Sequence, residues 1–137
     1  MTNMTIQKLY YGGKQKAFTL SYDDGVFQDK RLVEILNKNG LKATFNVNSQ
    51  LQDEVNQYEK RNTHVARINA NELKELYQGH ECAVHSATHP HLENLTEDNI
   101  RKEIVEDQKA LEELFEYPVR GMAYPFGTYN DLVLQVL

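Results

Sequence analysis

Two short segments contain the residues of this chain that could carry out chemistry. In residues 19–25, an apolar run ends in the adjacent carboxylates of Asp23 and Asp24, followed by Gly25. Further along, a second apolar run ends in His85 and His89, four positions apart. One carboxylate and two imidazoles suit zinc and other first-row divalent ions, and leave coordination positions for water or substrate. The second carboxylate would then lie beside the ion, where a hydrolase needs a base.

Each segment also has a simpler explanation when it is taken alone. Neighbouring strand residues face opposite sides of a sheet, so the two carboxylates can share a site only if Gly25 lets the chain turn sharply. Asp-Gly is equally a common solvated turn. The histidine spacing is that of metal-binding helices, but Pro90 disfavours helical geometry at His89, and two unrelated surface histidines are the alternative. Two such clusters in one small chain favour the metal site.

Short β-like runs, polar turns and helical patterns alternate along the chain and would position these residues. We predict strands over residues 16–22, 41–47, 81–85 and 119–124. We predict helices over residues 28–39, 70–78 and 130–137, and a long helix capped by Thr96. Residues 50–69 are predicted to be loop, with a short helix as the alternative. This alternation is typical of a parallel α/β sheet, either doubly wound or part of a β/α barrel.

The composition excludes several classes of function. The 137 residues carry a net charge of −5, and no stretch gathers Lys and Arg onto one face, so we expect no nucleic-acid partner. No run approaches the roughly 18 apolar residues that a membrane span needs, so we expect no membrane partner. The start lacks the apolar core of a signal peptide, and we expect a cytoplasmic location. The single cysteine, Cys82, excludes an internal disulfide and is expected to be a packed thiol.

Three segments resemble the motifs of the polysaccharide deacetylases, the metal-dependent carbohydrate esterases with a NodB homology domain, also called carbohydrate esterase family 4. The family's T-[FY]-D-D-G motif is similar to residues 21–25, with Ser21 in place of Thr. Its H-[ST]-x-x-H motif is matched fully by residues 85–89. Its R-P-P-Y-G motif is similar to residues 123–127, with Ala123 in place of Arg. Order and spacing agree across nearly the whole chain.

The resemblance implies a deformed β/α barrel of the NodB type, with parallel strands surrounded by helices. It also implies one divalent metal ion, with zinc preferred, held by Asp24, His85 and His89. Asp23 would be the general base, and the backbone N–H of Phe126 would be the oxyanion donor. The implied reaction removes acetyl groups from an N- or O-acetylated carbohydrate. Hydrolysis of cyclic amides or other non-peptide C–N bonds, a chemistry of related members, is the alternative.

The chain departs from the family pattern in two ways, and the first concerns the third motif. Ala123 replaces the Arg that pins the catalytic Asp; Arg120 could reach the same place, or be an ordinary surface charge on the opposite side of the strand. His91 and Tyr124 are weaker candidates for residues of the metal site. His91 could be a further metal ligand or could contact the ligands from outside.

The family's last two motifs, which supply an Asp and a general-acid His, do not occur. We therefore expect residues 1–137 to be the N-terminal part of a deacetylase domain, with an incomplete barrel. An exposed parallel edge would then be a candidate for self-association. A non-catalytic module that binds metal and carbohydrate is the alternative from a different functional class.

Overall fold

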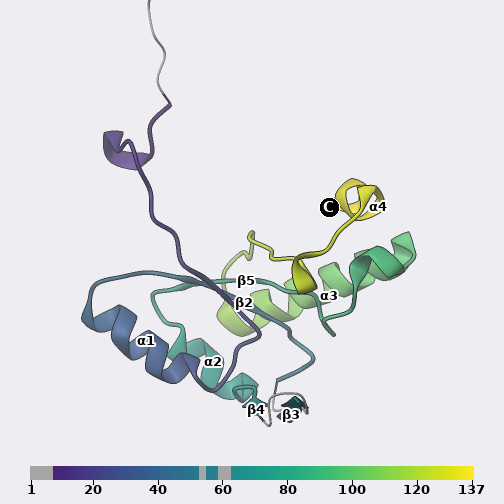
Figure 1. Ribbon diagram of the computed structural model, residues 1–137, viewed down its shortest axis with the longest axis horizontal. Helices are drawn as coiled ribbons and strands as arrows, with labels where there is room; N and C mark the ends of the chain where they lie inside the picture. The colour runs from purple at the N-terminus through teal and green to yellow at the C-terminus, as the bar shows by residue number, and fades with distance from the viewer. Residues whose placement is uncertain (1–7, 53–54, 59–62) are drawn as a thin grey trace, which may run out of the picture.

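The computed structural model describes residues 8–52, 55–58 and 63–137. Its main sheet has three parallel strands in the order β1-β2-β5: Ser21–Asp23, Thr44–Val47 and Glu81–Val84. Tyr22 pairs with Phe45, and Phe45 pairs with Cys82, so the three strands end at nearly the same level. The sheet does not close on itself (Figure 1). This confirms the predicted α/β class with parallel strands and an open barrel.

In the described part of the chain, four α-helices flank the sheet. They are α1 (Asp29–Lys38), α2 (Ala70–Leu76), α3 (Glu97–Phe115) and α4 (Asp131–Val136). Figure 1 shows α1 and α2 below the strands, α3 and α4 to their right, and an N-terminal arm that rises away from the sheet. The predicted helices are confirmed to within two residues at their ends. Thr96 precedes α3 as predicted, but its side chain makes no capping hydrogen bond.

Three strand predictions are wrong in extent, and the one over residues 41–47 begins only at Thr44, in β2. The strand expected over residues 16–22 is reduced to β1, because pairing with β2 begins only where Ser21 meets Thr44. The strand expected over residues 119–124 is reduced to one parallel bridge between Val84 and Met122. The N–H of Val84 donates to Gly121, and Ala123 donates back to Val84. The chain then enters a 3-10 turn at Pro125, which has no N–H to extend a ladder.

The loop predicted over residues 50–69 is also wrong in part. An antiparallel pair, β3 (Val55–Tyr58) and β4 (Thr63–Ala66), lies there. Residues 53–54 and 59–62 of this segment lie outside the described residues. The segment is polar, so the hydrophobic alternation that identifies strands is weak. The described residues of this segment contain no helix, so the short helix expected as the alternative is not found among them.

The largest core cluster joins the sheet to three helices. Phe45 of β2 stacks on Tyr77 just after α2, with ring centroids 4.2 Å apart. The other buried members of the cluster are Val33, Leu36, Ala43, Val47, Ile68, Leu73, Cys82, Val84, Leu111, Phe115 and Val119. Burial raises the pKa of the Cys82 thiol to about 12, as expected for a packed and unreactive cysteine. The predicted packed thiol is therefore confirmed.

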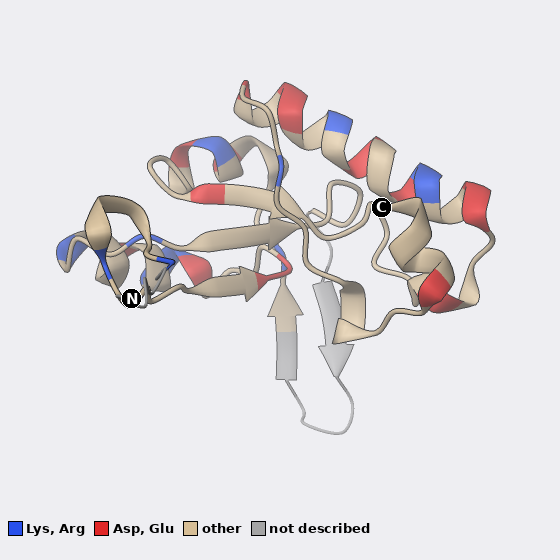
Figure 2. Ribbon diagram, turned by 90° about the horizontal axis from the view of Figure 1, so that it is seen from above, with Lys and Arg blue, Asp and Glu red and all other residues tan. Residues whose placement is uncertain are grey.

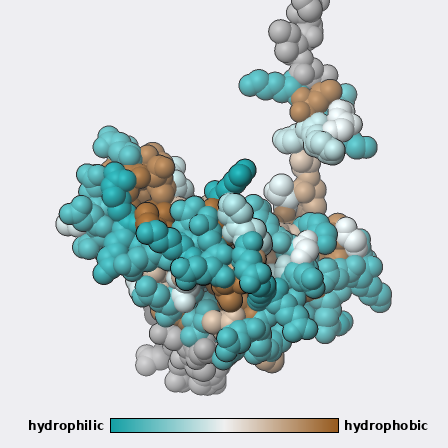
Figure 3. All heavy atoms as spheres, turned by 180° about the vertical axis from the view of Figure 1, so that it is seen from behind, coloured by the Kyte–Doolittle hydropathy of each residue, from teal (hydrophilic) through white to brown (hydrophobic). Residues whose placement is uncertain are grey.

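The outer surfaces of α3 and α4 differ in character. Lys and Arg are interspersed with Asp and Glu along α3, as Figure 2 shows, so this helix presents a solvated face of mixed charge. Apolar side chains gather over the region of α4 in Figure 3, where Leu134 and Leu137 are about half exposed. None of the described helices is long and apolar enough to span a bilayer.

Candidate metal centre

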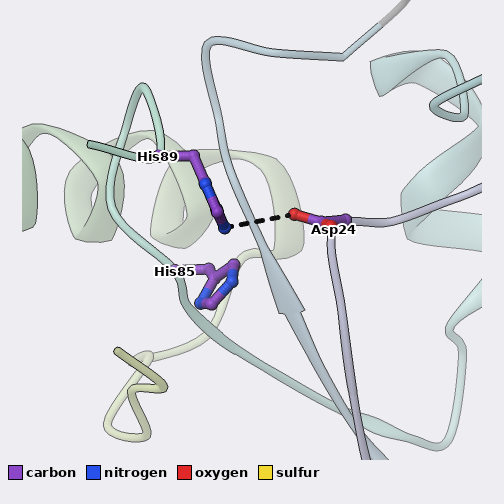
Figure 4. A group of neighbouring side chains, drawn as sticks. All are labelled: Asp24, His85 and His89. Atoms are coloured by element: carbon purple, nitrogen blue, oxygen red, sulfur yellow. Dashed lines mark ion pairs between the residues drawn. The ribbon is translucent and has the colours of Figure 1, made fainter. Parts of the chain in front are cut away.

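Asp24, His85 and His89 come together at the C-terminal edge of the sheet. One potential ligand atom from each lies within 4.8 Å of the other two. Nε2 of His89 is 3.6 Å from Oδ1 of Asp24, and the two imidazole rings are 4.8 Å apart between centroids. In Figure 4 both imidazoles face the carboxylate. One carboxylate oxygen and two imidazole nitrogens at this separation form a donor set that fits a divalent ion of the zinc type.

Asp24 reaches the cluster because the chain turns at the end of β1. Asp24 has a φ of 75° and Gly25 a φ of 61°, both in the left-handed region that glycine adopts most readily. The N–H of Asp24 donates to the carbonyl of Asn46 on β2, which fixes the start of the turn. The sharp turn expected at Gly25 is therefore present, and Asp24 itself shares the unusual conformation.

Arg67 lies beside Asp24 and was not anticipated from the sequence. Its Nη2 is 3.3 Å from Oδ1 of Asp24, and only 6% of its side chain is exposed. An antiparallel bridge between Val26 and Arg67 brings the two segments together. A fixed positive charge therefore faces the carboxylate that would bind the ion. No local sequence signal marks Arg67, because the contact depends on a pairing between distant segments.

His85 is held through both its ring and its backbone. Nδ1 is 2.9 Å from the carbonyl oxygen of Ala123, which leaves Nε2 as the nitrogen for an ion. The backbone N–H donates to Oδ2 of Asp107 at 2.9 Å, and the backbone carbonyl accepts from Nδ2 of Asn48 at 2.6 Å. Burial raises the pKa of the Asp107 carboxyl, opposed by hydrogen bonds from Ser49 and His85.

A strained loop carries the second histidine. Ser86 and His89 have φ values of 62° and 54°, so two non-glycine residues of this loop are left-handed. Glu103 of α3 holds the loop: its carboxylate accepts from the N–H and the hydroxyl of Thr88, and its backbone carbonyl accepts from Ala87. Burial lowers the pKa of His89; Asp24 opposes this shift, and His85 and Arg67 reinforce it. The neutral imidazole that metal binding requires is therefore favoured.

Asp23 lies next to the cluster but is not one of the three grouped residues. It is exposed, and its Oδ1 accepts a hydrogen bond of 2.7 Å from Nδ2 of Asn46. Asn46 is buried and stands opposite Asp23 in the register of β1 and β2. A neutral amide therefore orients this carboxylate. Its predicted role as general base stays a prediction.

Phe126 forms one wall of the site. Its φ is 59°, and its ring, 57% exposed, stacks on His91 and meets the edge of His89. His91 is not in the ligand group; its Nδ1 is 3.1 Å from Oε1 of Glu93. Tyr124 is half-buried and packs against Tyr129. His91 is thus separated from the ligands by one aromatic ring.

Ala123, which stands where the family has Arg, and Arg120, which could take the place of that Arg, lie in different surroundings. Ala123 contributes its carbonyl to His85, whatever its side chain. Arg120 is exposed, and the structure records no ion pair for it within the described part of the chain. The described residues therefore place Arg67, and not Arg120, beside the carboxylate of Asp24.

Sequence reasoning also missed Asn46, Asn48 and Asp107, although each leaves a signal. The two asparagines alternate with buried apolar residues at the end of the central strand, between the two strands that carry the motifs. Asp107 lies on the apolar stripe of α3, between Ile100 and Leu111, where a carboxylate is unexpected. A polar residue on a buried stripe indicates that it has a specific partner.

The sequence matches the family model for polysaccharide deacetylases over residues 11–137. The chain therefore belongs to the polysaccharide deacetylase family, as its motifs predict. A chitin deacetylase from Pestalotiopsis sp. is 29% identical over 121 residues, which make up 88% of this chain and 37% of the relative.

Solved structures agree with this assignment. The Streptococcus pyogenes deacetylase PplD, in complex with acetate, is 29% identical with a TM-score of 0.75, over 89% of this chain and 51% of that chain. A mutant of a CE4 family pseudoenzyme from Bacillus anthracis, with restored enzymatic activity, is 26% identical with a TM-score of 0.68. That match covers 86% of this chain and 39% of the other. The chain thus spans no more than about half the length of these relatives.

Proposed function

We propose that this chain carries the metal site of a hydrolase that removes acetyl groups from an N- or O-acetylated carbohydrate. The observation that supports this most strongly is the convergence of Asp24, His85 and His89 from two strand ends. The relatives add support, because one is a chitin deacetylase and another deacetylase was solved with acetate, the expected product. A bound divalent ion, for which we propose zinc, would polarise the acetyl carbonyl and lower the pKa of a water molecule toward about 7.

The residues of the chain supply the base and the oxyanion donor. Asp23 accepts the proton of the attacking water on the oxygen that Asn46 does not hold, Oδ2. The backbone N–H of Phe126 donates to the oxyanion that forms on the acetyl group, a contribution of about 3 kcal/mol for one such donor. The carbon–nitrogen or carbon–oxygen bond then breaks, and the leaving atom takes up a proton, which the general acid of the family's absent motif would supply. The products are acetate and a free amine or hydroxyl.

The turn around Phe126 supports its role as a donor. The N–H groups of Gly127 and Thr128 donate to Tyr124 and Pro125, which closes the turn. The N–H of Phe126 is not among the donors of the backbone hydrogen bonds formed by the described residues. A left-handed conformation at this residue makes such an exposed amide available to a ligand.

Acetate release tests the proposal. The zinc-loaded chain is incubated with acetylated chitooligosaccharides, acetylated xylooligosaccharides and a panel of cyclic amides. Because the general-acid motif does not occur in residues 1–137, we expect little acetate release from these residues alone. A version that supplies this acid should release acetate, and the release should stop on chelation and be lost in the His85→Ala variant. Turnover of cyclic amides without acetate release would contradict the proposal and favour the alternative C–N hydrolysis. Failure of the wild-type chain to bind any divalent ion would also contradict it.

A non-catalytic module that binds metal and carbohydrate is the second candidate. Two observations favour it: the general-acid motif of the family does not occur in residues 1–137, and Ala123 replaces the family's Arg. Calorimetric titration with acetylated oligosaccharides separates the two candidates. Binding that depends on His85 but is never followed by acetate release would support the module.

A further inference from the structure

The backbone of His85 is fixed by two side chains from outside its own strand. Its N–H donates to Oδ2 of Asp107 on α3, and its carbonyl accepts from Nδ2 of Asn48, which follows β2. Asp107 and Asn48 are both 0% exposed, and His85 is 2% exposed. A backbone held at both its donor and its acceptor has little freedom to move, and the contact of Nδ1 with the Ala123 carbonyl then fixes the direction of the imidazole.

These contacts replace the backbone ladder where β2 and β5 separate. Regular pairing ends with Val47 opposite Val84. Just beyond, the amide of Asn48 donates to the carbonyls of both His85 and Ser86, at 2.6 and 2.9 Å. Oδ1 of Asp107 accepts from the N–H of Ser49 at 2.7 Å. One carboxylate and one amide therefore bridge the ends of two neighbouring strands at the edge where the ligand atoms meet.

We propose that Asp107 and Asn48 are positioning residues of the metal centre, which fix the backbone of His85 so that its Nε2 faces Asp24 and His89. The ring nitrogen Nδ1 is already engaged by Ala123, so the backbone decides where Nε2 lies. This inference rests on the proposed function in one respect: the three ligands must bind a divalent ion.

An isosteric change at Asp107 breaks the arrangement in a defined way. Both carboxylate oxygens accept a backbone N–H, one from Ser49 and one from His85. Asparagine has one acceptor oxygen and one donor NH₂ group, so in Asp107→Asn one of the two N–H groups faces another donor. Changes of this kind behind a metal ligand typically weaken metal affinity by about 10–100-fold.

Glu112→Gln is the matched control. Glu112 lies on the same helix and accepts the backbone N–H of Val119 at 3.0 Å, so it makes the same kind of contact away from the ligands. The affinity for Zn²⁺ is measured by calorimetric titration of the metal-free chain, and the ligand geometry by the visible spectrum of the Co²⁺-loaded chain. We expect Asp107→Asn to weaken Zn²⁺ binding by about 10–100-fold and to change the Co²⁺ spectrum, and Glu112→Gln to do neither.

Circular dichroism first establishes that each variant is folded. If Asp107→Asn is unfolded, Asn48→Ser is used instead. This variant releases the carbonyls of His85 and Ser86 and leaves the Asp107 contacts intact. The same loss of affinity and the same spectral change are expected. An unchanged affinity and spectrum in the folded variant would overturn the positioning role, while zinc binding by the wild-type chain would leave the proposed function standing. Absence of zinc binding by the wild-type chain would overturn both.

Discussion

The imidazole of His91 lies face to face with the ring of Phe126, with centroids 3.9 Å apart and 8° between the ring planes. Stacked aromatic pairs contribute about 0.5–1.5 kcal/mol beyond the area that they bury. We therefore expect a coupling of about this size in a double-mutant cycle with Phe126→Ala and His91→Ala, measured as the free energy of unfolding in urea. A cycle between Phe126 and the distant His80 is the control and should be additive to within about 0.5 kcal/mol. Additivity in the first cycle would contradict the stacking contribution.

Asp23 and Asp24 should respond differently to the same substitution. In a catalytically active, metal-loaded protein, Asp23→Asn should retain the ion and lose about 10²–10⁴-fold in turnover, because it removes the base and no ligand. Asp24→Asn should weaken ion binding directly. Both are checked by metal titration and acetate release. If Asp23→Asn loses the ion while Asp24→Asn retains it, the two roles are reversed.

Removing the charge of Arg67 should tighten metal binding. The guanidinium, 3.3 Å from Asp24, competes with the ion for the carboxylate and repels it. Unit charges 4 Å apart interact by about 4 kcal/mol at an effective dielectric constant of about 20, so even a fraction of this matters. We expect Arg67→Met to increase the zinc affinity by about tenfold or more in a chelator competition assay. Weaker binding would mean instead that Arg67 chiefly holds Asp24 in place.

Protonation of His80 should make the fold less stable in mild acid. Its Nδ1 accepts from the N–H of Ala43 at 3.2 Å, and its Nε2 is 3.1 Å from the side-chain oxygen of Asn37, so the neutral ring satisfies both partners. Burial, reinforced by Lys42, lowers the pKa of His80 below its usual value. The unfolded chain then binds the proton more readily than the folded chain. The stabilisation that neutral His80 contributes is therefore complete above about pH 6.5, and it is lost as the pH falls toward the pKa of His80 in the folded state.

The urea midpoint of the metal-free chain at pH 7.5 and pH 5.5 checks this dependence. His80→Gln is the comparison, because it cannot titrate in this range while all other groups remain. The wild-type chain should lose more stability than the variant between the two pH values. An equal loss in both would contradict the prediction.

The cluster of Asp24, His85 and His89 was predictable because its information is local. Each motif places its polar residues directly after a strand, and the ends of parallel strands meet at one edge of the sheet. The helices were predictable for a similar reason, since apolar periodicity and the terminal residue Gly40 are features of the segment itself. The residues that hold the ligands were not. Asp107 reaches His85, and Arg67 reaches Asp24, only through the tertiary arrangement.

Strand extents failed for a related reason. A segment becomes a strand only where a neighbouring segment pairs with its backbone. A strand-like composition does not ensure that such a neighbour is present. Residues 16–20 have the composition of a strand but find no ladder, and residues 119–124 form a single bridge before Pro125 ends the pairing. The β3–β4 pair shows the reverse case, in which polar sequences pair with each other despite weak patterning.

The four non-glycine residues with left-handed backbones at this edge (Asp24, Ser86, His89 and Phe126) have an evolutionary consequence. Each such conformation costs of order 1–3 kcal/mol, which glycine would largely avoid. By backbone strain alone, glycine would be favoured at all four positions. At Asp24 and His89 the side chains are those proposed to bind the ion, so in a library selected only for folding we expect glycine to accumulate at these two positions.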